Sequence, residues 1–301
     1  MKNMNKYENC LLCPRKCGIN RATGQTGVCG VSSEIKVARA ALHYWEEPCI
    51  SGKKGSGAVF FSGCSLHCVF CQNREISDGK AGKVISKERL SDIFLELKAK
   101  GANNINLVTP GQYIPDIVWA VSDARRRGME LPIVYNTSGY ENADELKQLE
   151  GIVDVYLPDF KYMDSALSAK YSRAKDYPSV AKQTISEMVR QQPRVVIDDA
   201  TGLIQKGVIV RQLLLPGHVN DAKTILKYLH DTYQDSIYIS MMSQFTPIAL
   251  KDYPEINRTV TRREYERLID YAINIGITNA FIQEGNVAKD SFIPAFDGEG
   301  V

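Results

Sequence analysis

The chain has 301 residues, a formal net charge of +2, 44% hydrophobic residues and 24% charged residues. This composition is ordinary for a soluble globular protein, and the length suffices for one large core with small additions. The near-neutral charge gives no reason to expect binding to nucleic acid or to an anionic membrane. No apolar run approaches the ~20 residues that span a bilayer, and the polar start lacks a signal-peptide core. We therefore expect a cytoplasmic protein with no nucleic-acid partner and no membrane partner.

The cysteines are confined to the first quarter of the chain. They are Cys10, Cys13, Cys17, Cys29, Cys49, Cys64, Cys68 and Cys71. Disulfides are disfavoured in the cytosol, where clustered cysteines more often bind metal or take part in catalysis. A disulfide scaffold would also be expected to staple residues 72–301, which contain no cysteine.

Residues 1–50 are rich in cysteine and glycine and are expected to be irregular. Farther on, apolar runs of strand length alternate with stretches of helical periodicity. The expected strands are 58–62, 105–109, 132–136, 153–157, 207–215, 236–240 and 279–283. The expected helices are 86–101, 114–128, 142–151, 179–192, 220–233 and 261–276, with Ser86 and Asn142 as candidate N-caps.

This alternation predicts an α/β fold built from βα units. Runs without polar alternation suit parallel strands that are covered on both faces. A doubly wound sheet and a full or partial barrel both remain open, and both place their chemistry at the carboxyl ends of the strands. The segments GCSLHC, TPGQY, NTSGY, PDFKY and PGH follow the first five strands and are therefore expected at one edge.

Cys64, Cys68 and Cys71 follow the first of these strands in a loop that begins with glycine. They could share one face of a helix and pack as small hydrophobes, or one could be a nucleophile. Three thiolates at the catalytic end of a β/α fold instead form a soft, negatively charged site suited to an iron–sulfur cluster. Three protein ligands leave one metal position open for substrate or cofactor. We favour the metal site.

The C-x3-C-x2-C spacing after the first strand of a β/α fold resembles the signature of the radical S-adenosylmethionine (SAM) superfamily. Longer strings resemble proteins identified as pyruvate formate-lyase activating enzyme-like, a largely uncharacterised branch. They are LCPRKCGINR, EEPCISGKKGSG, FFSGCSLHCVFCQN, NINLVTP, VYNTSGYE, VYLPDFKY and FIPAFDGEG. The resemblance implies a partial (β/α)6-type TIM-like barrel over residues 51–301, preceded by a cysteine-rich metal-binding extension over residues 1–50.

The resemblance also implies the chemistry. Cys64, Cys68 and Cys71 would hold a [4Fe-4S] cluster whose open iron binds SAM, and Phe70 would pack near the adenine. One electron from a donor such as flavodoxin or ferredoxin would cleave SAM to methionine and a 5′-deoxyadenosyl radical. That radical would take a hydrogen atom from the substrate, so the cofactor carries the radical and no catalytic side chain is assigned.

Four strand-end residues correspond to family motifs that bind SAM. Thr109 and Gly111 stand where the family has a Gly-Gly-Glu-type motif for the SAM amino group, but the carboxylate is absent here. Asn136 and Ser138 belong to a segment that resembles the Asp-Thr-Asn-Gly stretch of the activating enzymes. Asn in place of Asp removes a charge from what is, in those enzymes, a site for a monovalent cation and SAM.

Asp159 and Lys161 resemble the Asp-Leu-Lys of the same enzymes, and Arg211 resembles an arginine that reaches toward SAM. Asp159 and Lys161 could instead be an exposed ion pair of little energetic consequence. Arg211 lies within an apolar strand, where its charge must face a pocket or be paired. We favour cofactor-binding roles for all three.

Cys10, Cys13, Cys17 and Cys29 form C-x2-C-x3-C-x11-C in a segment too small to fold on its own core. Four thiolates could hold zinc or a second iron–sulfur cluster, and the spacing does not decide between them. A zinc-type nucleic-acid module is disfavoured because stacking aromatics are nearly absent, and unliganded core cysteines are a further alternative. Cys49 is either a free thiol or a spare ligand.

Two enzymatic functions remain open at this stage. One is a glycyl-radical activase, whose partner is a glycyl radical protein attacked at a backbone Cα–H. The other is a radical SAM enzyme that acts on a small molecule or on a peptide. A non-catalytic iron–sulfur or zinc protein is disfavoured, because the cysteine triplet leaves an open site at the catalytic end of the fold.

Overall fold

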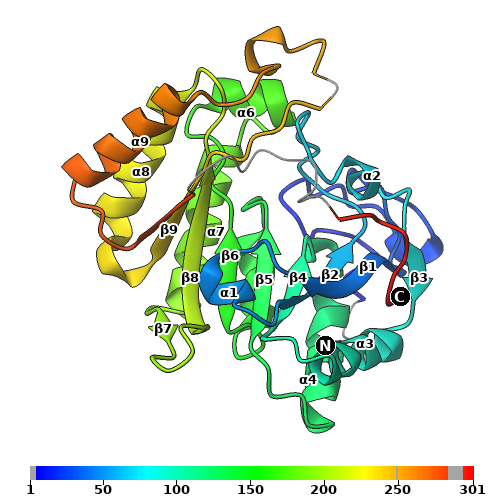
Figure 1. The fold of residues 1–301 in the computed structure, drawn as a ribbon. Coiled ribbons are helices and arrows are strands. Elements are labelled where there is room, and N and C mark those ends of the chain that lie inside the picture. The colour runs from blue at the N-terminus through cyan, green and yellow to red at the C-terminus, as the bar shows by residue number, and fades with distance from the viewer. Residues whose placement is uncertain (1–4, 249, 284–293) are drawn as a thin grey trace.

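The computed structural model describes residues 5–248, 250–283 and 294–301, and its central element is a curved sheet (Figure 1). The strand order is β10–β9–β8–β6–β5–β4–β2–β1–β3, with β7 paired to β8. The strands are β1 Ile35–His43, β2 Ser56–Phe61, β3 Lys83–Ile85, β4 Ile105–Val108, β5 Ile133–Thr137, β6 Val155–Pro158, β7 Val196–Ile197, β8 Ile204–Leu213, β9 Tyr238–Met242 and β10 Ala280–Ile282. From β2 to β10 along this order all pairings are parallel. In the described ranges the edge strands β10 and β3 do not pair, which confirms a partial barrel.

The helices lie mainly on the outer face of the sheet. They are α1 Pro48–Ser51, α2 Arg74–Ser77, α3 Lys87–Ala99, α4 Ile114–Arg126, α5 Ala143–Leu146, α6 Ser165–Ser172, α7 Tyr177–Gln191, α8 Val219–Tyr233 and α9 Arg262–Asn274. The predicted caps are confirmed, because the side chain of Ser86 accepts from the Arg89 amide and that of Asn142 from the Asp144 amide. No described helix is long and apolar enough to cross a membrane.

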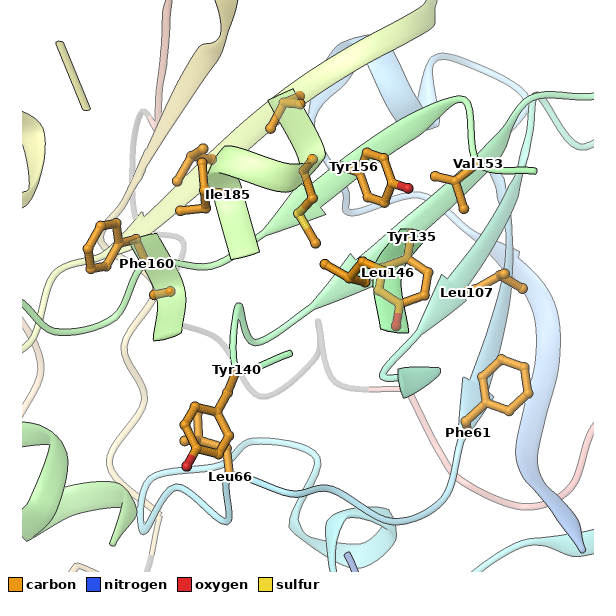
Figure 2. Close-up of a cluster of buried hydrophobic side chains, with 14 of the residues drawn as sticks. Phe61, Leu66, Leu107, Tyr135, Tyr140, Leu146, Val153, Tyr156, Phe160 and Ile185 are labelled. Carbon is orange, nitrogen blue, oxygen red and sulfur yellow. The ribbon is translucent and has the colours of Figure 1, made fainter. Parts of the chain in front are cut away.

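The outer face of the sheet forms the main hydrophobic core. Figure 2 shows Leu107 of β4, Tyr135 of β5 and Tyr156 of β6 in this core, together with Ile185 of α7. All four are fully buried. Because successive side chains of a strand point to opposite faces, the neighbouring residues along each strand face the barrel interior. The apolar runs of the sequence therefore contain a second set of positions that face the site.

Helix α1 fills part of the barrel interior, which Figure 1 shows as a short blue helix in front of β5, β6 and β8. Cys49 and Ile50 of α1 join a buried cluster of inward-facing residues. The other buried members are Val134, Val155, Leu157, Ile204 and Ile209. Burial, followed by the nearby carboxylate of Glu47, raises the pKa of Cys49 to about 12. Cys49 is thus a packed free thiol inside the barrel.

The amino-terminal quarter contributes a strand that was not expected. Residues 35–43 form β1, which pairs antiparallel with β2 and places part of the supposedly irregular segment in the barrel sheet. The carboxyl-terminal tail returns to this strand: the Gly298 amide donates to the Ala38 carbonyl (3.0 Å) and the Ala40 amide to the Glu299 carbonyl (2.8 Å). The carboxyl-terminal residues therefore pack against β1.

Glu264 stabilises the start of α9 through several hydrogen bonds. It forms a capping box with Thr261, accepts from the Gly217 amide (2.7 Å), and pairs with Arg258 (2.7 Å). We expect Glu264→Gln to lower the free energy of unfolding by about 1–2 kcal/mol in urea titrations, since both the cap and the ion pair weaken.

The matched control is Glu266→Gln on the same helix, whose exposed pair with Arg262 should contribute less than about 0.5 kcal/mol. The hydrogen bond from Arg258 is the main cause of the lowered pKa of Glu264. Its contribution is therefore present above the unfolded-state pKa near ~4.3 and is lost as pH falls through the folded-state pKa. Equal losses for the two variants would contradict the assigned role.

Candidate active site

A cavity of about 230 Å³ lies at the carboxyl ends of the parallel strands. It brings together residues that are far apart in the sequence but were all expected at strand ends. They are Cys64, Cys68, Phe70, Cys71, Thr109, Asn136, Ser138, Asp159, Lys161 and Arg211. These residues lie on β5 and β8 or in the loops after β2, β4, β5 and β6. The strand-end expectation therefore matches the geometry of the fold.

The cysteine loop leaves β2 through Gly63, whose φ of +90° favours glycine. A Cβ at this position would approach the Cys29 carbonyl oxygen to 2.7 Å, so the loop and the amino-terminal segment are in close contact. Burial, and next the charge of Cys68, raises the pKa of Cys64 to about 11. Burial, Cys68 and Cys64 in that order raise the pKa of Cys71 to about 12.

Cys68 lies beside two polar groups that affect its pKa, Lys161 and Ser172. Burial raises its pKa, whereas the Lys161 ammonium and a hydrogen bond from Ser172 (3.2 Å) act in the opposite direction. Both groups favour the thiolate form that a metal requires. The environment of Cys68 therefore suits a ligand better than a purely structural cysteine.

The donor set fits an iron–sulfur cluster with three protein ligands. The three thiols are free, line one cavity, and lie close enough that Cys68 raises the pKa of both others. Ligand thiols must lose their protons, so binding a cluster would release protons and strengthen with rising pH. In the described ranges no three His, Cys, Asp or Glu side chains already stand in a metal-binding arrangement, so the ligand assignment stays a prediction.

Arg211 is the centre of a buried ion-pair network beside the cysteines. Its guanidinium donates to Asp159 (2.8 Å), Glu46 (3.1 Å) and Asn136 (2.5 Å). Lys161 donates to the second Asp159 oxygen at 2.6 Å. The charged side chains are only 10–17% exposed, so Asp159 and Lys161 are not an exposed surface pair.

The network favours the charged forms of Asp159 and Arg211. Burial favours the neutral form of Asp159, but Arg211 and Lys161 outweigh it and lower the pKa of the carboxyl. Burial also acts to lower the pKa of Arg211, but the carboxylates of Asp159, Glu46 and Glu47 outweigh it, so that pKa is raised. The cavity thus presents fixed charges of both signs in a place from which most water is excluded.

Glu46 is the main site residue that the sequence did not predict. It precedes α1 and enters the barrel, where one of its oxygens accepts from Asn106 (3.0 Å) and Asn136 (3.2 Å). The next residue, Glu47, is buried, and one of its oxygens has no hydrogen-bond partner in the described part of the chain. Burial raises the pKa of Glu47, and Arg211 opposes this effect.

The loop after β4 contains two residues that were expected to bind the cofactor, Thr109 and Gly111. Thr109 lines the main cavity, but Gly111 lies along a second, smaller cavity. The Gln112 amide donates to the carbonyls of Ser62 (3.0 Å), Gly63 (3.1 Å) and Thr109 (2.8 Å). Gln112 therefore joins the start of the cysteine loop to the neighbouring strand end.

The second cavity holds the amino-terminal cysteines. Cys10, Cys13, Cys17 and Cys29 all line it, together with Cys64 of the triplet and the buried Glu141. Burial is the main cause of the raised pKa of Cys13, about 12, and of Glu141, about 7. Arg21 is almost fully buried beside these groups and donates to the Cys10 sulfur at 3.7 Å.

Comparison with known proteins finds a similarity to one protein superfamily. The model of the radical SAM superfamily matches residues 58–204, which include the cysteine triplet and the strand ends up to Lys161. The match supports a place for this chain in the radical SAM superfamily. The cavity, the triplet and the open parallel barrel are what a radical SAM protein is expected to share.

A curated relative, an uncharacterized protein of Methanocaldococcus jannaschii, is 28% identical over 276 residues, which are 89% of this chain and 75% of the relative. A crystal structure of Streptococcus suis SuiB bound to S-adenosylmethionine has a TM-score of 0.51 at 12% identity over 74% of this chain. The chain spans about half the length of SuiB (49%), and the likeness concerns the fold alone.

Methylornithine synthase is 15% identical over 70% of this chain and 59% of its own, with a TM-score of 0.48, too low to support an argument. The family-model match supports the radical SAM superfamily, and none of these comparisons confirms the pyruvate formate-lyase activating enzyme-like branch.

Proposed function

We propose that this radical SAM protein cleaves SAM reductively at a [4Fe-4S] cluster held by Cys64, Cys68 and Cys71. One observation carries the proposal: the three free thiols line the same strand-end cavity as the buried Arg211 network. When bound, the cluster and SAM supply a 5′-deoxyadenosyl radical, which takes a hydrogen atom from the substrate.

The chain's own residues bind and orient the cofactor. Phe70 is buried at the cavity with its ring centroid 5.5 Å from that of Phe245, and the two provide an apolar surface for an adenine ring. Asp159, Lys161 and Arg211 provide opposite charges for the amino and carboxylate groups of the methionine part. Because these side chains are already ordered by one another, binding needs little rearrangement.

We propose a protein as hydrogen donor, in keeping with the resemblance to glycyl-radical activating enzymes. Trp45 lines the cavity and is 60% exposed, and the neighbouring Tyr44 is 50% exposed. Exposed aromatic side chains beside a cavity are typical of protein-binding surfaces. A small molecule or a peptide as substrate is the alternative that the experiment below distinguishes.

We further propose a second metal, zinc or iron–sulfur, at Cys10, Cys13, Cys17 and Cys29. The shared cavity and the burial of Cys10 and Cys29 support it. Metal analysis of the wild type should show a metal beyond the four irons of the triplet cluster, and Cys13→Ala should lose that metal alone. Full retention of all metals in Cys13→Ala would contradict this assignment.

The test of the main proposal is anaerobic. The protein is reconstituted with iron and sulfide, SAM and photoreduced deazaflavin are added, and 5′-deoxyadenosine is measured by chromatography. Product formation supports the proposal, and failure to assemble any [4Fe-4S] cluster refutes it. Addition of a candidate glycyl radical protein should then produce a protein-based radical in the electron paramagnetic resonance spectrum. A radical or product found only with small molecules or peptides would favour the alternative substrate.

A further inference from the structure

A third hollow, of about 500 Å³, lies against the cysteine loop, apart from the cofactor cavity and from the cavity of the amino-terminal cysteines. Its lining includes Arg15, His67, Cys68, Arg74, Asp78 and Arg173. Cys68 lines both this hollow and the cofactor cavity. The hollow therefore approaches one proposed cluster ligand without passing through the SAM site.

The hollow is positively charged. Arg74 and Arg173 are exposed, and within the described part of the chain neither side chain has an ion-pair partner. Arg15 donates to the carbonyls of Ser65 (2.9 Å) and Arg173 (2.7 Å), which hold its guanidinium in place. Carbonyl oxygens carry no net charge, so the positive charge of Arg15 is not cancelled.

The acidic groups at the hollow do not cancel its positive charge. Among the described lining residues the one carboxylate is Asp78, and it pairs with Lys80 at 2.9 Å. Val28, which is 46% exposed, adds an apolar contact to the basic rim. A basic rim around a small apolar patch matches a small acidic protein surface.

We propose that this basic hollow, defined by Arg15, Arg74 and Arg173 around Cys68, is the docking surface for an acidic one-electron carrier protein. The proposal rests on the proposed function, since the carrier would deliver one electron to the cluster. The carrier is oxidised by one electron and the cluster is reduced by one electron, with no bond formed or broken in the transfer. Docking here leaves the cofactor cavity free for SAM and substrate.

Electrostatic steering explains why the charges matter. Electron-transfer complexes are small and transient, so their affinity and association rate depend on complementary charge more than on buried area. Such steering weakens as salt shortens the Debye length to ~8 Å at physiological ionic strength. Two unpaired arginines beside a cluster ligand can therefore determine how fast the cluster is reduced.

The experiment compares two double charge reversals of equal size. Arg74→Glu with Arg173→Glu changes the hollow, whereas Arg263→Glu with Arg267→Glu changes exposed positions on α9, far from α2 in Figure 1. The probe is a flavodoxin of strongly negative net charge. Its Kd for the reconstituted protein is measured by titration calorimetry at low and high salt, and the rate of cluster reduction by stopped-flow absorbance.

The hollow variant should bind at least about tenfold more weakly at low salt and lose most of its salt dependence, while the α9 variant stays within about twofold. Reduction by neutral photoreduced deazaflavin should be the same in all three proteins, and circular dichroism should show an intact fold. Equal weakening in both variants, or none in the hollow variant, would overturn the docking surface. Failure of the wild type to cleave SAM with deazaflavin would instead overturn the proposed function, while the Kd comparison still tests the surface.

Discussion

Replacing Cys68 by alanine is expected to prevent stable assembly of the [4Fe-4S] cluster and to reduce 5′-deoxyadenosine formation by more than about 100-fold. Removing groups that merely support a metal ligand typically costs 10–100-fold, and loss of a ligand should cost more. Cys68 also accepts a hydrogen bond from Ser172 and is affected by the positive charge of Lys161. No other described residue reproduces this environment. Iron content, visible absorption and product formation are the measurements.

Cys49→Ala is the matched control for this experiment. Cys49 is equally free of disulfides but is packed with Ile50 against the inner face of the barrel. Its loss should lower the free energy of unfolding by about 1 kcal/mol through a small cavity and leave cluster content and activity within about twofold of the wild type. A Cys68→Ala protein that retained a full cluster, or a Cys49→Ala protein that lost it, would contradict the ligand assignment.

The sequence predicted the location of the site because parallel strands share one carboxyl edge. Once the strands were recognised, the loops after them had to meet, and the structure places Cys64, Asn136 and Asp159 on one cavity. The positions of polar residues within the strands also indicate which face of the sheet lines the site. Asn106, Asn136 and Arg211 all occupy inward-facing positions, next to outward-facing core residues such as Tyr135.

Glu46 and β1 could not be predicted in the same way, because both depend on contacts between distant segments. Glu46 falls in the segment that was expected to be irregular, and only the insertion of residues 46–51 into the barrel makes Glu46 a partner of Arg211. Gln112 is another residue whose role the local sequence does not indicate. Its position in the segment TPGQY indicates no structural role, yet its amide donates to the Thr109 carbonyl and to the carbonyls of Ser62 and Gly63, which lie 50 and 49 residues away in sequence.

Replacing Arg211 by methionine is expected to lower the free energy of unfolding by about 3–5 kcal/mol at pH 7. Removing one partner of a buried ion pair leaves the remaining charges uncompensated, which costs far more than the pair itself contributes. Glu46 is then left without an ion-pair partner among the described residues, Asp159 keeps only Lys161, and both carboxylate side chains are at most 17% exposed. Urea unfolding of the unreconstituted protein measures this loss independently of the cofactor, and SAM binding should weaken in parallel.

Glu46→Gln in the Arg211→Met background provides the decisive comparison, because Arg211 is the ion-pair partner of Glu46. If the cost comes from an uncompensated carboxylate, removing that carboxylate should recover part of the loss, so the double variant is less destabilised than the sum of the single variants.

The pH dependence follows from the same cause. Wild-type Asp159 has a lowered pKa, so its contribution is present above the unfolded-state pKa near ~3.9 and is lost as pH falls through the folded-state pKa. In Arg211→Met, Asp159 loses the charge that lowers its pKa most, so its carboxyl takes up a proton at higher pH and the stability gap to the wild type should narrow between pH 7 and 5. Two results together would contradict this account: strict additivity of the two substitutions, and a stability difference from the wild type that does not change with pH. They would mean that Arg211 acts through packing alone. The proposal that these charged side chains bind the methionine part of SAM would then lose its main support.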